Sequence, residues 1–74
     1  MSKKSDLKKA IEDKELEIEA LEKKRDRSQS ALMTAMLMMT QPKKEDVDYF
    51  TTFTSLIDKE REELRLLYRQ LANL

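Results

Sequence analysis

The segment that decides the fold is Thr40-Gln41-Pro42-Lys43-Lys44, the one strong break in a chain of helix-forming residues. Pro42 disfavours helical geometry at Gln41, but its own fixed φ suits the first turn of a following helix. Acidic residues follow at once, where the dipole of a new helix favours negative charge: Glu45, Asp46 and Asp48. We therefore predict a helix that ends near residue 40, a turn at about 41–43 and a second helix that begins near 44.

The composition on either side of this break favours a wholly helical protein. The 74 residues include one Pro and no Gly, and 41% of them are charged, with 15 basic and 15 acidic side chains. Sheets of several strands need turn residues at positive φ, so this composition argues against most β-rich folds. We expect an all-α, antiparallel two-helix hairpin as a single domain over residues 1–74, with helices at about 5–40 and 44–73.

Both predicted helices contain heptad repeats, which allows their register to be predicted. The apolar positions align best when Arg25 of the first helix faces Glu60 of the second, with Glu22 opposite Arg61. A slipped register would leave the two seam charges facing apolar residues. We therefore predict that Arg25 and Glu60 form the pair that sets the register.

The segment 31–39 is apolar at every position except Thr34. The predicted seam uses only Leu32, Ala35 and Met39 of these residues, which leaves a surplus near the loop. Such an excess indicates a contact surface, and the flexible thioether of methionine suits one. The predicted partner-binding residues are Met33, Met36, Leu37, Met38, Val47, Tyr49 and Leu56. Two alternatives stay open, in which these side chains thicken the core or meet a second copy of the hairpin. A smaller apolar patch is expected at the other end, around Leu16 and Tyr68.

Other classes of function have little support in the residues. Without Cys and His, the chain has no disulfide and none of the usual transition-metal ligands, so we expect no metal and no cofactor. A two-helix hairpin offers no water-excluding cleft, so we expect no enzyme activity. Basic and acidic residues alternate, which argues against nucleic-acid binding. No apolar run resembles a membrane span or a signal peptide, so we expect a cytoplasmic protein.

The second half of the chain has a pattern of its own. Pro42 precedes Tyr49 by a short acidic turn, an aliphatic stripe follows, and the chain closes with Leu66-Leu67-Tyr68-Arg69. This pattern resembles the small YscE/EscE-type co-chaperones of type III secretion needle proteins. The resemblance implies a partner chaperone of the tetratricopeptide type, which together with the co-chaperone keeps the needle subunit monomeric before export. It assigns no binding residue.

The sequence thus leads to two hypotheses about function. The first is a small protein-binding co-chaperone or adaptor of a type III secretion system that helps a partner chaperone hold an export substrate such as the needle subunit. The alternative is a self-assembling structural or regulatory hairpin, whose homodimer forms a four-helix bundle. The two differ in whether the methionine-rich surface meets a foreign protein or a second copy.

Overall fold

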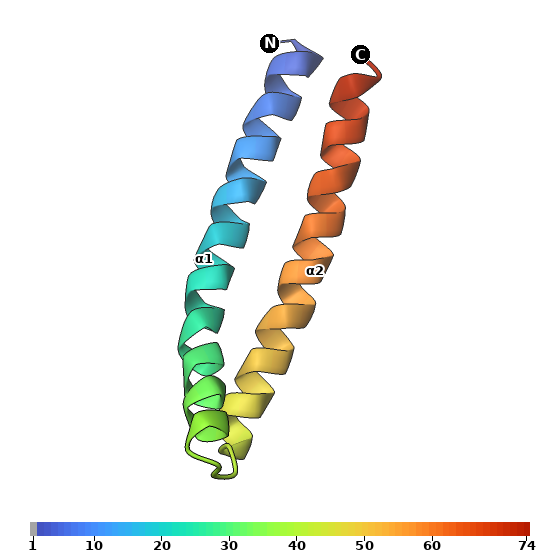
Figure 1. Cartoon of the computed structure of the whole chain (residues 1–74). Coiled ribbons are helices and arrows are strands. Elements are labelled where there is room, and N and C mark those ends of the chain that lie inside the picture. Colours follow the sequence, from blue (N-terminus) through green and yellow to red (C-terminus); the bar gives the residue numbers. More distant parts are fainter. Residues whose placement is uncertain (1) are drawn as a thin grey trace.

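The computed structural model describes residues 2–74 and consists of two long helices joined by a short loop (Figure 1). Helix α1 spans Lys3–Leu37, with 35 residues, and helix α2 spans Lys44–Ala72, with 29 residues. The helices lie side by side and antiparallel, so that both chain ends are at the same end of a rod 54 Å long. The predicted all-α hairpin is confirmed.

The helix starts follow local sequence signals. At α1 the Ser2 hydroxyl accepts a hydrogen bond from the Ser5 backbone N–H at 3.1 Å. This bond satisfies one of the N–H groups that a helix leaves unpaired in its first turn. Helix α2 begins at Lys44, where the sequence predicts its start, directly after Pro42 and Lys43.

Helix α1 ends at Leu37, earlier than the predicted end near residue 40. Met39 adopts a left-handed conformation with φ of 55°, and the Thr40 N–H donates to the Ala35 carbonyl at 2.9 Å. The Met39 N–H donates to the Met36 carbonyl at 3.1 Å, which completes a Schellman cap. Met39 was predicted in the seam, but it is 93% exposed in the loop. The reason is the cap, which turns the chain away from the helix before the next heptad position is reached.

The core is a narrow seam between the helices. Ile57 is completely buried, and the other residues classed as buried all come from α1: Leu7, Ile11, Ile18 and Ser28. These residues hold the predicted seam positions, so the heptad repeats identify the buried face of each helix correctly. Most of the remaining seam residues are only partly covered.

The predicted pairing of Arg25 with Glu60 is wrong, whereas the flanking pair of Glu22 with Arg61, predicted from the same alignment, does form. Glu60 pairs with Lys14 and not with Arg25, which lies about three helical turns further along α1. The Arg25 guanidinium lies instead over the ring of Phe50, 6.0 Å from its centroid. The physical reason is the early end of α1: because the chain reverses sooner, Glu60 lies beside an earlier residue of α1 than predicted. The buried residues still occupy the predicted seam positions, so the seam remains mainly apolar.

Candidate protein-interaction surface

The loop end of the hairpin has a large exposed apolar surface. Every residue predicted to bind a partner is exposed there, from Val47 at 39% to Leu37 at 82%. Met36 is 76% exposed, and Met39, which the sequence prediction did not include, adds another large side chain. Monomeric proteins rarely leave so many large apolar side chains together in water. This end of the rod is therefore the strongest candidate for a contact surface.

Two contacts between the helices define one side of the seam, which we name the tyrosine flank. Arg61 pairs with Glu22 at 3.6 Å, as the sequence predicts, and the Tyr68 hydroxyl donates to Glu15 at 3.0 Å. When the heptad is lettered a to g with the seam residues at a and d, and with Lys14 and Glu60 at d, these four residues all hold position e, as expected for one side of an antiparallel pair. The same heptad position is occupied nearer the loop by Met36 and Val47.

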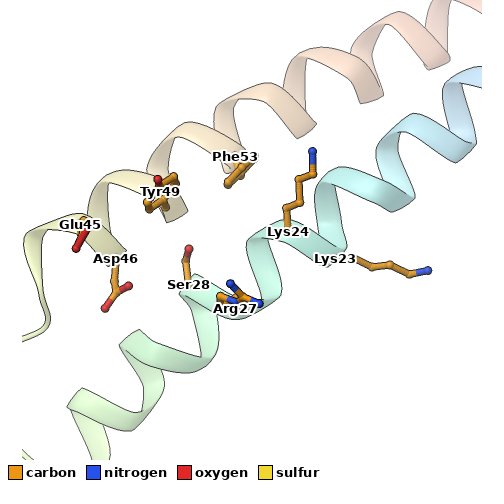
Figure 2. Close-up of a pocket in the computed structure, with 8 residues that line it drawn as sticks. All are labelled: Lys23, Lys24, Arg27, Ser28, Glu45, Asp46, Tyr49 and Phe53. Carbon is orange, nitrogen blue, oxygen red and sulfur yellow. The ribbon is translucent and has the colours of Figure 1, made fainter.

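The opposite side of the seam, which we name the groove flank, contains the remaining predicted residues of α2. A groove of about 610 Å³ lies here between the helices, close to the loop (Figure 2). Tyr49 and Phe53 of α2 form one wall, with their rings stacked at 6.1 Å between centroids, and Ser28 of α1 lines the opposite side. Leu56 shares the heptad position of Tyr49 and so belongs to this flank, whereas Met38 is the cap residue that follows α1.

The predicted surface therefore consists of separate parts, because the hairpin has two flanks and an outer side. Tyr49 and Leu56 belong to the groove flank, Met36 and Val47 belong to the tyrosine flank, and Met38 lies at the start of the loop. Met33 and Leu37 occupy outer positions of α1, away from α2 by their heptad positions. One partner helix cannot cover all of these side chains. The hairpin could therefore make two different protein contacts, one on the groove flank and one on the exposed residues of α1.

The groove also has a charged wall on each helix. α1 contributes a basic wall of Lys23, Lys24 and Arg27, and α2 contributes an acidic wall of Glu45 and Asp46. Lys23 points away from α2 (Figure 2) and pairs with Glu19 at 3.3 Å. Over residues 2–74, the other charged side chains of the groove form no ion pair. Their charges therefore remain available to a molecule that docks on this flank.

A cluster of charges crosses the seam in the other half of the rod. The Lys14 ammonium lies 2.6 Å from Glu60, 2.8 Å from Glu63 and 3.4 Å from Glu17. The hydrogen bonds to Glu60 and Glu63 raise the pKa of Lys14, and the hydrogen bond from Lys14 lowers the pKa of Glu60. The heptad alignment did not predict this cluster. The sequence did contain a signal for this cluster, since Lys14 and Glu60 occupy seam positions and carry opposite charges.

Arg25 brings an unsatisfied polar group into the seam, over the residues that the structure describes. Its Nε atom is buried without a hydrogen-bond partner, and so is the Thr54 hydroxyl. A buried polar atom without a partner opposes folding because its hydration is lost and not replaced. The contact of Arg25 with the Phe50 ring offsets part of this cost.

The second apolar patch, at the end remote from the loop, contains Leu16 and Leu66, which are 64% and 42% exposed. The hydroxyl of Tyr68 is engaged within the chain, because it donates to Glu15, and this hydrogen bond raises the pKa of Tyr68. Tyr68 thus has a structural role between the helices. This patch is a weaker candidate for a contact surface than the loop end.

No family model, curated protein or solved structure matches this chain. Neither helix contains a stretch that is both long and apolar enough to cross a bilayer, over the residues that the structure describes.

Proposed function

We propose that this hairpin acts by binding another protein through the apolar residues at its loop end. The observation behind the proposal is the exposure of Met33, Met36 and Leu37, which are 55%, 76% and 82% exposed. Each large apolar side chain that becomes buried contributes roughly 1.5 to 3 kcal/mol. A partner that covers these residues gains a substantial hydrophobic contribution, while the unbound hairpin leaves them in water.

The spacing of these residues favours a particular mode of binding. Met33, Met36 and Leu37 follow the i, i+3, i+4 pattern of a helix whose apolar face docks into a groove. The concave surface of a helical-repeat protein provides such a groove. The end of α1 would then act as the inserted helix, and the six-residue loop 38–43 would limit how far it enters.

A more specific proposal follows from the sequence resemblance. In it the protein is a small co-chaperone of a type III secretion system, and its partner is a tetratricopeptide-type chaperone that holds an export substrate such as the needle subunit. The exposed row on α1 is the type of ligand that such a repeat protein accommodates. The alternative function, self-assembly, is favoured by a different observation and uses the groove flank.

The first experiment identifies the partner and tests the surface together. The tagged full chain is recovered from its native cells, the proteins that accompany it are identified by mass spectrometry, and the purified partner is titrated against variants. Met36→Asp combined with Leu37→Asp should weaken binding tenfold or more, which is about 1.4 kcal/mol. Helicity, measured by circular dichroism, should be preserved because both side chains are exposed.

The matched control replaces two exposed residues of α1 that lie further from the loop. Leu16→Asp with Ala20→Asp introduces the same two charges on exposed positions of the same helix. Partner binding should survive this change. Equal binding by the loop-end variant and the wild type would refute the proposed surface, and a loss of binding in the control would move the site to the remote end. A partner that is neither a repeat chaperone nor an export substrate would contradict the more specific proposal.

A further inference from the structure

We propose that the groove flank binds a second copy of this chain, with the two rods parallel, their loops together, and a two-fold axis along the rod. This inference goes beyond the proposed function because it uses the groove flank, whereas the proposed function uses the exposed row on α1.

The first reason for proposing a dimer is the thin core of the hairpin. Ile57 is the one large side chain that is completely buried over residues 2–74, while Tyr49 and Leu56 on the groove flank remain 55% and 40% exposed. Small helical domains usually need more buried apolar surface than one such seam provides.

The charges of the groove indicate that the occupant is a second copy. One wall is basic and comes from α1, and the other wall is acidic and comes from α2. A surface with both signs on separate walls is self-complementary under a two-fold rotation, because each wall can meet its opposite in the other copy. A purely acidic or purely basic partner would be repelled by one of the two walls.

The positions of the walls also select the orientation. A two-fold axis along the rod places α1 of one copy against α2 of the other and keeps each residue at its own level along the rod. Arg27, the basic residue nearest the acidic end of the groove, then comes close to Asp46 of the other copy, while Lys24 lies level with Phe53 (Figure 2). An axis across the rod would place α1 against α1, and the two basic walls would repel each other. The arrangement with parallel rods is therefore the favoured one.

Two further features fit the parallel arrangement. The basic side chains of one copy would lie over the stacked rings of Tyr49 and Phe53 in the other, where cations interact favourably with aromatic faces. Each helix would also have only antiparallel neighbours, as in an up-down four-helix bundle. Met33, Met36 and Leu37 lie off the groove flank. The exposed row on α1 would therefore stay uncovered in the dimer and could still bind a foreign partner.

The first test measures the dimerisation constant of the full chain by sedimentation equilibrium. The variant Lys24→Glu/Arg27→Glu and the variant Glu45→Lys/Asp46→Lys should each dimerise at least tenfold more weakly than the wild type. An equimolar mixture of the two variants should dimerise again, because each basic wall then meets an acidic one in both contacts of the heterodimer. Recovery in the mixture also shows that neither variant has simply failed to fold.

A control separates this proposal from the proposed function. Met36→Asp with Leu37→Asp should leave the dimerisation constant unchanged, because both residues lie off the groove flank. A monomer at all concentrations, or a dimer that is insensitive to the groove charges, would overturn the dimer while leaving partner binding through α1 intact. A dimer disrupted by the Met36 and Leu37 changes would also overturn it.

The second test measures the orientation. The chain contains no Cys, so a single spin label can be attached at Gln41→Cys in the loop. The parallel dimer should give a label-to-label distance far below 54 Å, the length of the rod. A label at Lys4→Cys, at the other end, should also give a short distance. Distances close to the rod length at both sites would show the opposite orientation and refute the proposed arrangement.

Discussion

The Nζ atom of Lys14 lies 2.6 Å from the Oε2 atom of Glu60, on the opposite helix. Each of the two side chains is only 19% exposed, so this ion pair belongs to the seam rather than to the solvated surface. Heptad repeats alone permit several registers that differ by whole heptads, because each brings apolar rows together. Charged seam residues distinguish these registers, since a wrong one leaves a charge against apolar side chains. Lys14 and Glu60 therefore take the register-setting role that the sequence predicted for Arg25 and Glu60.

A double-mutant cycle tests this assignment. Lys14→Glu should lower the melting temperature because it gathers like charges at the seam, and adding Glu60→Lys should recover much of the loss. The matched cycle with Arg25→Glu and Glu60→Lys should show no coupling, since these residues do not meet. Thermal unfolding followed by circular dichroism gives both values. Coupling between 25 and 60, and none between 14 and 60, would restore the register predicted from the sequence.

The same pair should shape the dependence of stability on pH. The pKa of Glu60 lies below its ordinary value of 4.5, so its contribution is present above pH 4.5 and disappears as the pH falls through the lowered pKa. The pKa of Lys14 is raised above 10.5, so its contribution is complete below pH 10.5 and disappears as the pH rises further. Stability should decline at both extremes.

The variant Lys14→Met isolates this effect. Its difference in unfolding free energy from the wild type should shrink in acid below pH 4.5, where the wild type loses the same interaction. Tyr68, whose pKa is also raised, should still add an alkaline decline in the variant. Urea titrations at a series of pH values provide the measurement. A difference that stays constant into strong acid would contradict the role of the pair.

Replacement of Arg25 by Leu should stabilise the hairpin. Leu removes the unpaired Nε atom from the seam and leaves an apolar residue beside Phe50. The gain should be about 1 kcal/mol, after the loss of the cation–π contact is subtracted. Asp26→Leu, at the exposed neighbouring position, is the control and should change stability little. A less stable Arg25→Leu variant would show that the stacked guanidinium outweighs its missing hydrogen bond.

Replacement of Met39 by Gly should also stabilise the fold. The left-handed conformation at φ of 55° costs a residue with a side chain roughly 1 kcal/mol, and Gly avoids this cost. The midpoint of urea unfolding should rise accordingly. Met38→Gly is the matched control, because Met38 has φ of −86° and gains nothing from the change. An equal gain in both variants would indicate a cause other than relief of the left-handed strain.

The exposed surface and the side of the seam on which each residue lies were largely predictable from the heptad positions, whereas the groove was not. The apolar run at 31–39 exceeds what one seam can bury, so exposure of Met33, Met36 and Leu37 follows from the sequence pattern. The groove does not follow from the sequence pattern, because its walls combine residues of α1 and α2. Which of these residues lie close together depends on the register of the helices. Arg27 and Asp46, for example, share the groove only because the helices meet where they do.

The sequence by itself determined two helices, their buried faces and the start of α2, because these depend on Pro42 and on a periodicity that spans only a few residues. Only the tertiary structure decided where α1 ends and how the helices align. No Gly marks the end of α1, and Met39 takes the left-handed position that Gly usually fills. Slipping one helix by a heptad keeps every apolar row in place, so the register depends on long-range contacts such as Lys14 with Glu60 and on where the chain turns.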